Sequence, residues 1–235
     1  MKKLSKKAKR YDRDRSLNLL ERAVRGFDDL IAPVLAAANK QLGRLPSCAT
    51  CTTPGCCSQM VLVTLVEAAV VARHLLRVGR DTQGLRRHLN KLGGEQQKLG
   101  RHGWWRAARP CSFLKDGRCS IYEVRPVMCR TWSAWSEPRP CQPPAAHDVT
   151  TVEMVGVGRA LVQLNTEVCG QLGLDDCYFY AGNLPRMLGL ALRFLDLGSA
   201  RGVEFLKGQE FMTPLKMMAW FGRAAGLQEG ETEVQ

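Results

Sequence analysis

The chain has 235 residues, of which 45% are apolar and 24% charged, and its net charge is +12. This composition excludes an intrinsically disordered chain and fits one folded domain of ordinary size. The longest apolar run, residues 60–72, is shorter than the roughly 20 residues of a membrane-spanning helix, and charged residues at 11–15 replace the apolar part of a secretory signal. We therefore expect a cytoplasmic protein that makes no membrane contact.

The positive charge is concentrated at the start of the chain. Residues 1–15 hold eight Lys or Arg and two Asp, which gives this segment a charge of +6. Such a run predicts a basic disordered tail, and the alternative is a contact with an acidic partner or with nucleic acid. The last residues, 228–235, are predicted to be an acidic tail. A single domain over residues 16–227 remains between the two tails.

Apolar residues then recur at intervals of three and four, the spacing of amphipathic helices. The first such stretch covers residues 17–42, although Pro33 should kink or split it. The second covers 62–76. The third covers 85–99, with Thr82 as its N-cap.

The second half of the chain continues the helical pattern. A helix over 152–168 follows a capping box of Thr150 and Glu153. Further helices are expected over 185–195 and over 213–226, where Thr213-Pro214 is a typical start. Because no stretch alternates with period two, the predicted fold is all-α, with about six helices.

Two segments, residues 43–59 and 103–148, interrupt this pattern and are predicted to be irregular loops. The second contains six of the eleven prolines. An irregular loop of this length is unusual inside a compact domain, so something must hold it in place. Eight of the ten cysteines lie in these two loops, which we expect to be organised around a metal site.

Clustered thiols in a reducing compartment are typical of metal ligands or redox centres and not of disulfides. Two thiolates three residues apart, as in Cys48-Ala-Thr-Cys51, are able to bind one ion. Adjacent cysteines point in different directions, so the pair Cys56-Cys57 leaves open which thiol is a ligand. The second group consists of Cys111, Cys119, Cys129 and Cys141.

The order of residues around the second group is more specific than the spacing alone. Cys111 is followed by Phe-Leu, a glycine turn, Cys119, Ile-Tyr-Glu, Arg-Pro and then Cys129-Arg. Together with the first group, this order resembles the YkgJ-like cysteine-cluster proteins, a family with a CxxCxxCC motif that is associated with chelation of zinc or iron. The chain departs from the family in having four residues between Cys51 and Cys56 instead of two.

The resemblance implies that one set of thiols binds metal: Cys48, Cys51, Cys57, Cys111, Cys119 and Cys129, with Cys56 as a further candidate. Cys141 would raise the number to eight, enough for two sites of four thiolates. Arg125 and Arg130 are placed to offset the negative charge of such a site, and the alternative for both is ordinary ion pairing. Cys169 is expected to pack in the core.

These observations favour a metal-binding protein with a redox, assembly or metal-handling role. Seven or eight thiolates exceed the four that one zinc ion needs, which favours an iron–sulfur cluster of the four-iron type, although two zinc ions would use eight thiolates equally well. Two alternatives stay open. One is an enzyme resembling the bacterial flagellin lysine N-methylases, and the other is a zinc-stapled module that binds nucleic acid or protein.

Overall fold

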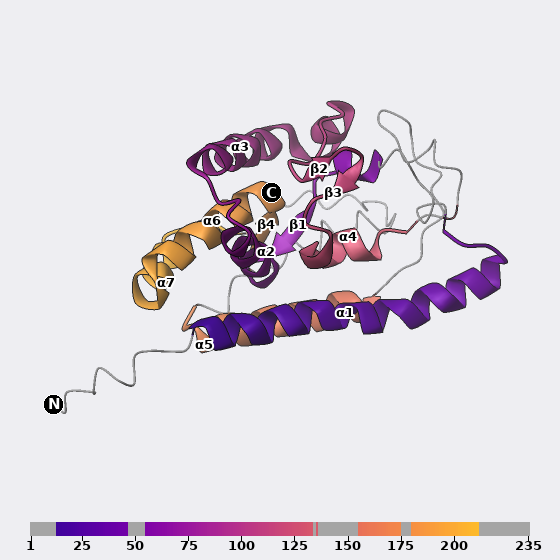
Figure 1. Ribbon diagram of the computed structural model, residues 1–235, viewed down its shortest axis with the longest axis horizontal. Helices are drawn as coiled ribbons and strands as arrows, with labels where there is room; N and C mark the ends of the chain where they lie inside the picture. Colours follow the sequence, from indigo (N-terminus) through magenta and orange to yellow (C-terminus); the bar gives the residue numbers. More distant parts are fainter. Residues whose placement is uncertain (1–12, 47–54, 134, 136–154, 175–179, 212–235) are drawn as a thin grey trace, which may run out of the picture.

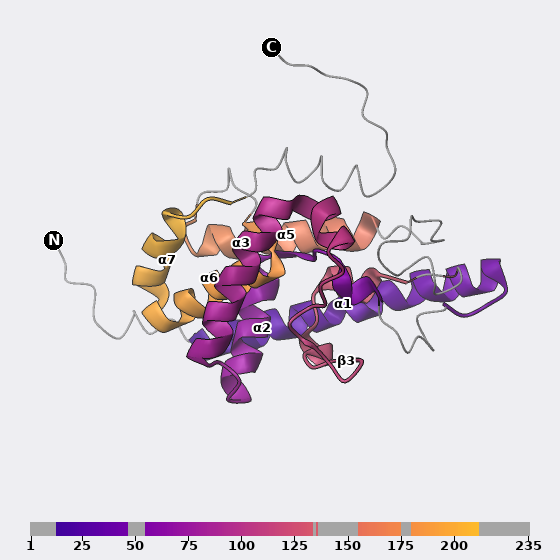
Figure 2. The same cartoon turned by 90° about the horizontal axis from the view of Figure 1, so that it is seen from above.

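The computed structural model describes residues 13–46, 55–133, 135, 155–174 and 180–211 (Figure 1). The chain is mostly helical, as predicted. The central helix is α6 (Leu184–Leu197), which contacts α2 (Leu65–Arg77), α3 (Gln83–Arg106) and α7 (Ser199–Lys207). The long helix α1 (Arg13–Leu42) packs against α2, and α5 (Val155–Gln171) packs against both (Figures 1 and 2).

Two short strands fix the starts of the central helices. Strand β1 (Leu62–Thr64) pairs antiparallel with β4 (Ala181–Asn183), and each strand leads directly into a helix. Thr64 caps α2 by accepting a hydrogen bond from the Glu67 amide, and Asn183 caps α6 in the same way. Side-chain caps of this kind satisfy amides that have no partner within the helix. The starts of α2 and α6 are therefore held side by side.

The core lies between these helices and is formed by their apolar faces. Leu75, Leu89, Leu188 and Leu192 are completely buried in it. Burying one such side chain contributes about 1.5–3 kcal/mol, so these faces supply much of the stability of the fold. Cys169 of α5 is also in this core, as predicted, and its burial raises the pKa of the thiol to about 12.

The strands correct the all-α prediction. β1 and β4 have three residues each, too few to produce a visible alternation, and all of β1 is buried. Of the two outcomes predicted for Pro33, a kink or a split, the structure excludes the split, because α1 is one helix with Pro33 inside it. Ile31 and Ala38, on either side of this proline, are both buried, so packing holds both halves of the helix. Since α1 begins at Arg13, the last three residues of the predicted tail are helical.

The predicted loop over 103–148 is in part regular. A kink at Gly100, whose φ is 62°, ends the first part of α3, and a second helical part continues to Arg106 and buries Trp104, with 1% of its surface exposed. Four short elements follow: β2 (Leu114–Lys115), β3 (Arg118–Cys119), the 3₁₀ helix η3 (Tyr122–Val124) and α4 (Val127–Thr131). The loop over 43–59 likewise contains the 3₁₀ helix η2 (Gly55–Ser58).

Several predictions fall outside the described residues. These are the capping box of Thr150 and Glu153, the helix over 213–226, the acidic tail and most of the basic tail. Helix α7 was not among the predicted elements. In the part of the chain that the structure describes, no helix combines the length and the apolar character needed to span a bilayer.

Candidate metal centre

Five of the eight predicted ligands lie in the described residues, at the end of the core where the short elements meet. They come from three separate elements or loops: Cys56 and Cys57 from η2, Cys111 and Cys119 from the β2–β3 hairpin and the residues before it, and Cys129 from α4. The amide of Cys111 donates a hydrogen bond to the carbonyl of Cys57 over 2.7 Å. This bond joins the two cysteine groups directly, although 53 residues separate them between Ser58 and Pro110. Cys48, Cys51 and Cys141 lie outside the described residues.

The β2–β3 hairpin brings the second cysteine of its group back toward the first. Asp116 and Gly117 both have positive φ, at 50° and 73°, as the tight turn of a two-residue hairpin requires. Through this turn Cys119 pairs with Leu114, whose amide donates to the Cys111 carbonyl over 3.0 Å. The sequence Asp-Gly therefore places Cys119 near Cys111.

Cys129 is held by contacts of its neighbours in the chain. The Val127 amide donates to Glu67 Oε1 of α2 over 2.7 Å, and Met128 Sδ accepts from the Leu62 amide of β1 over 3.4 Å. On the other side, Arg130 donates to Asp28 of α1. Three different elements of the core thus fix the backbone that carries Cys129.

Glu67 is a functional candidate that the sequence analysis did not identify. It is 1% exposed, and besides Val127 it accepts hydrogen bonds from the amide and the hydroxyl of Thr64. Burial raises the pKa of this carboxyl, and the donating groups act in the opposite direction. The signal in the sequence was its place as the only charged residue in the apolar run 60–72. A carboxylate in such a run needs buried partners.

The thiols affect one another electrostatically. Burial raises the pKa of Cys129 well above its ordinary value, and the charges of Cys111, Cys119 and Cys56 raise it further. Burial also raises the pKa of Cys111, while for Cys56 the hydrogen bond with Cys57 is the largest cause and burial the second. The thiol of Cys129 therefore lies within electrostatic range of Cys111, Cys119 and Cys56. Among the described residues, no three His, Cys, Asp or Glu side chains form a group with the geometry of ligands to one ion.

The two predicted arginines have partners of their own. Arg130 is buried, and it donates to Asp28 and to the carbonyls of Arg125 and Glu123. The guanidinium of Arg125 lies over the ring of Tyr122, 3.7 Å from its centre. These three hydrogen bonds account for the burial of the Arg130 side chain without a metal. That either arginine offsets the negative charge of a metal centre stays a prediction.

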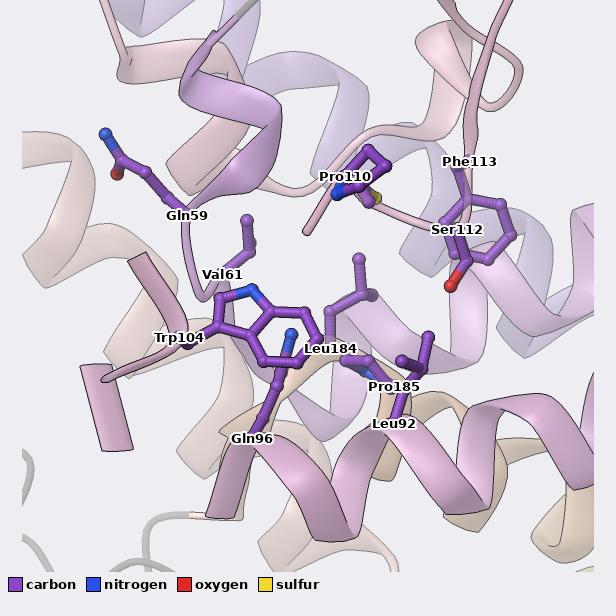
Figure 3. Close-up of a pocket in the computed structure, with 11 residues that line it drawn as sticks. Gln59, Val61, Leu92, Gln96, Trp104, Pro110, Ser112, Phe113, Leu184 and Pro185 are labelled. Carbon is purple, nitrogen blue, oxygen red and sulfur yellow. The ribbon is translucent and has the colours of Figure 1, made fainter. Parts of the chain in front are cut away.

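A small pocket adjoins Cys111, between α3 and the start of α6 (Figure 3). Figure 3 shows the ring of Trp104 and the side chain of Gln96 on one wall and Pro110 and Ser112 opposite them. Trp104 thus packs beside the segment that carries Cys111. The cavity of about 20 Å³ holds about one water molecule, so it is too small for a substrate.

The comparison with known families concerns the same part of the chain. Residues 47–169 match the model of the CxxCxxCC family, described as "Putative zinc- or iron-chelating domain". The chain belongs to this family. The matched residues begin one position before Cys48 and include all eight predicted ligands. No curated protein and no solved structure matches the chain.

Proposed function

We propose that the protein binds an iron–sulfur cluster through its clustered cysteines and uses it in a redox, assembly or metal-handling role. The observation that carries this proposal is the hydrogen bond from the Cys111 amide to the Cys57 carbonyl, which joins two cysteine groups that are far apart in the sequence. The hairpin that returns Cys119 toward Cys111, and the effect of Cys56, Cys111 and Cys119 on the pKa of Cys129, support it. The ligands would be drawn from these thiols, from Cys57, and from Cys48, Cys51 and Cys141. Family membership supports binding of zinc or iron in general.

The number of donors, and not their kind, favours one iron–sulfur cluster over one zinc ion, and two zinc ions remain the alternative. Thiolates suit both, but the eight cysteines outnumber the ligands of one zinc ion. His88 lies 3.2 Å from the hydroxyl of Ser112, the residue after Cys111, and its Nε2 is therefore engaged with that hydroxyl. When bound, an iron–sulfur cluster would supply one-electron transfer.

The residues around the thiols would do three things for such a group. Glu67 and Arg130 hold the backbone on either side of Cys129, so this ligand would need little reorganisation to bind. The Asp116-Gly117 turn holds Cys119 near Cys111. The buried side chains of Phe113, Ile121 and Val124 pack against the same segment of chain and would limit the access of water, which tunes the potential of a cluster.

The test is purification under strictly anaerobic conditions, followed by elemental analysis and a visible absorption spectrum. An iron–sulfur protein absorbs broadly in the visible range and bleaches on reduction, and its iron and acid-labile sulfide are present in equal amounts. A colourless, folded protein with stoichiometric zinc would overturn the iron–sulfur proposal and leave a zinc-binding module. A folded protein that retains neither metal after reconstitution would overturn both.

A further inference from the structure

The small pocket beside Cys111 contains a polar group that the metal centre does not explain. Gln96 of α3 lines this pocket with 5% of its surface exposed, and its Oε1 atom is buried. None of the described residues donates a hydrogen bond to this oxygen. Figure 3 shows the side chain of Gln96 directed from α3 toward the space between the Trp104 ring and Leu184. A buried acceptor without a donor is costly, so the pocket calls for an occupant that donates.

The size and the walls of the pocket limit what this occupant is. Its volume of about 20 Å³ matches one water molecule and excludes an organic ligand. A divalent cation takes about six oxygen ligands, whereas most of this wall is apolar. An apolar gas molecule would leave Gln96 Oε1 without a donor. The apolar side chains of the wall are Val61, Leu92, Phe113, Leu184 and Pro185.

A buried water needs two or more polar partners, and the pocket offers them. The indole of Trp104, on the same wall as Gln96, is a donor for the water oxygen. Of the side chains that are able to accept the second water proton, Ser112 has its hydroxyl engaged with His88 Nε2 at 3.2 Å. The amide of Gln59 points away from Trp104 and Gln96 in Figure 3. The remaining acceptor on the wall is the sulfur of Cys111.

We propose that this pocket binds one ordered water molecule, which donates hydrogen bonds to Gln96 Oε1 and to the sulfur of Cys111. The water site stands on the pocket alone, and only its consequence for a metal centre rests on the proposed function. A donor to a ligand sulfur stabilises the added negative charge of a reduced cluster and therefore raises its reduction potential. Gln96 is then a positioning residue, which acts on Cys111 through the water.

The first test is a crystal structure of the full-length protein at a resolution that shows ordered waters. A water oxygen should lie about 3 Å from Gln96 Oε1 and in contact with Cys111 Sγ. In solution, NMR should detect magnetisation transfer from this water to the ring protons of Trp104. A dry pocket, or a water that contacts Gln96 and not Cys111, would overturn the proposal.

The variant Gln96→Met removes the acceptor and nearly preserves the length of the side chain. Because the water loses a partner, the thermal unfolding midpoint should fall by about 2–4 °C and the transfer to Trp104 should weaken. The matched control is Gln97→Met, the same substitution at the next residue of α3, which is exposed. It should leave the transfer unchanged and shift the midpoint by less than about 1 °C. A higher midpoint in Gln96→Met would mean that Oε1 was unpaired in a dry pocket, and this result, or equal transfer in Gln96→Met and the unaltered protein, would overturn the water site.

The reduction potential tests the bond to Cys111. In protein that carries a cluster, Gln96→Met should shift the potential to a more negative value, and Gln97→Met should leave it unchanged. An unchanged potential in Gln96→Met would overturn the hydrogen bond to Cys111. If the protein holds no cluster, the proposed function fails, while the crystal structure and the NMR measurement still decide whether the water is present.

Discussion

The strand–helix core and the cysteine segment (residues 109–131) are stabilised in different ways. In the core, β1 and β4 lead into capped helices of 13 and 14 residues that bury leucine and valine on each other. In the cysteine segment the strands have two residues each and α4 has five. A hairpin of that size is at best marginally stable by itself. The segment is therefore fixed by its contacts with the core and, in our proposal, by metal.

The largest effect should follow from removing a proposed ligand. We expect Cys129→Ser and Cys119→Ser each to lower the metal content strongly and to expose residues 109–131 to protease. A structural metal contributes on the order of 10 kcal/mol to the folding of the part that it organises. Elemental analysis and limited proteolysis measure both effects. Cys169→Ala is the control, since this thiol lies in the core and should leave the metal content unchanged. Full metal loading in both serine variants would contradict the proposed site.

A core substitution should have the opposite pattern. Leu188→Ala removes a completely buried side chain from the centre of α6 and should lower the free energy of unfolding by about 2–5 kcal/mol. The metal content of the folded protein should not change. Urea unfolding combined with elemental analysis checks this separation, and Leu76→Ala, at a position 43% exposed, is the matched control that should cost far less. Loss of metal from folded Leu188→Ala would mean that the two regions are not separable.

Glu67 connects the two regions, so its substitution should affect both. All the groups that face its carboxylate donate hydrogen bonds, and Glu67→Gln would turn an amide N–H toward one of them. We expect a loss of about 1–3 kcal/mol in unfolding free energy. Faster hydrogen exchange at the Val127 amide would show that α4 has loosened. Glu204→Gln, on the exposed side of α7, is the control and should change neither the unfolding free energy nor the exchange rate. Unaltered exchange at the Val127 amide in Glu67→Gln would show that Glu67 does not position Cys129.

The smallest effects should come from the helix caps. Thr82 caps α3 at an exposed position by accepting from the Leu85 amide, and Thr82→Ala should cost about 1 kcal/mol. Asn183→Ala should cost more, because the Asn183 side chain also donates to the Gly93 carbonyl in the buried contact between α6 and α3. Thermal or urea unfolding of the two variants measures the difference. Equal costs would show that the buried bond adds nothing to the cap.

The helices were predictable because their cause is local. The spacing of apolar residues marked α2, α3 and α6 without any knowledge of their neighbours, and Thr82 and Pro185 marked two of the starts. The strands were not predictable, since three residues are too short for a period and each strand exists through a partner about 120 residues away in the sequence. The sequence left open whether Pro33 kinks or splits the first helix, and burial of Ile31 and Ala38 on either side of the proline accompanies one continuous helix.

For the candidate site, the sequence by itself determined which donor groups are available. The cysteines, their spacing and the Asp-Gly turn between Cys111 and Cys119 all predicted thiolate ligands before any fold was known, and the family match supports chelation of zinc or iron in general. Only the tertiary structure decided how the thiols are held. The roles of Glu67, Leu62 and Asp28 around Cys129 depend on hydrogen bonds that span 60 to 102 residues of chain. Residue types and short spacings can be read directly from the sequence. A hydrogen bond between distant segments, in contrast, forms only when the packing of the core places those segments next to each other.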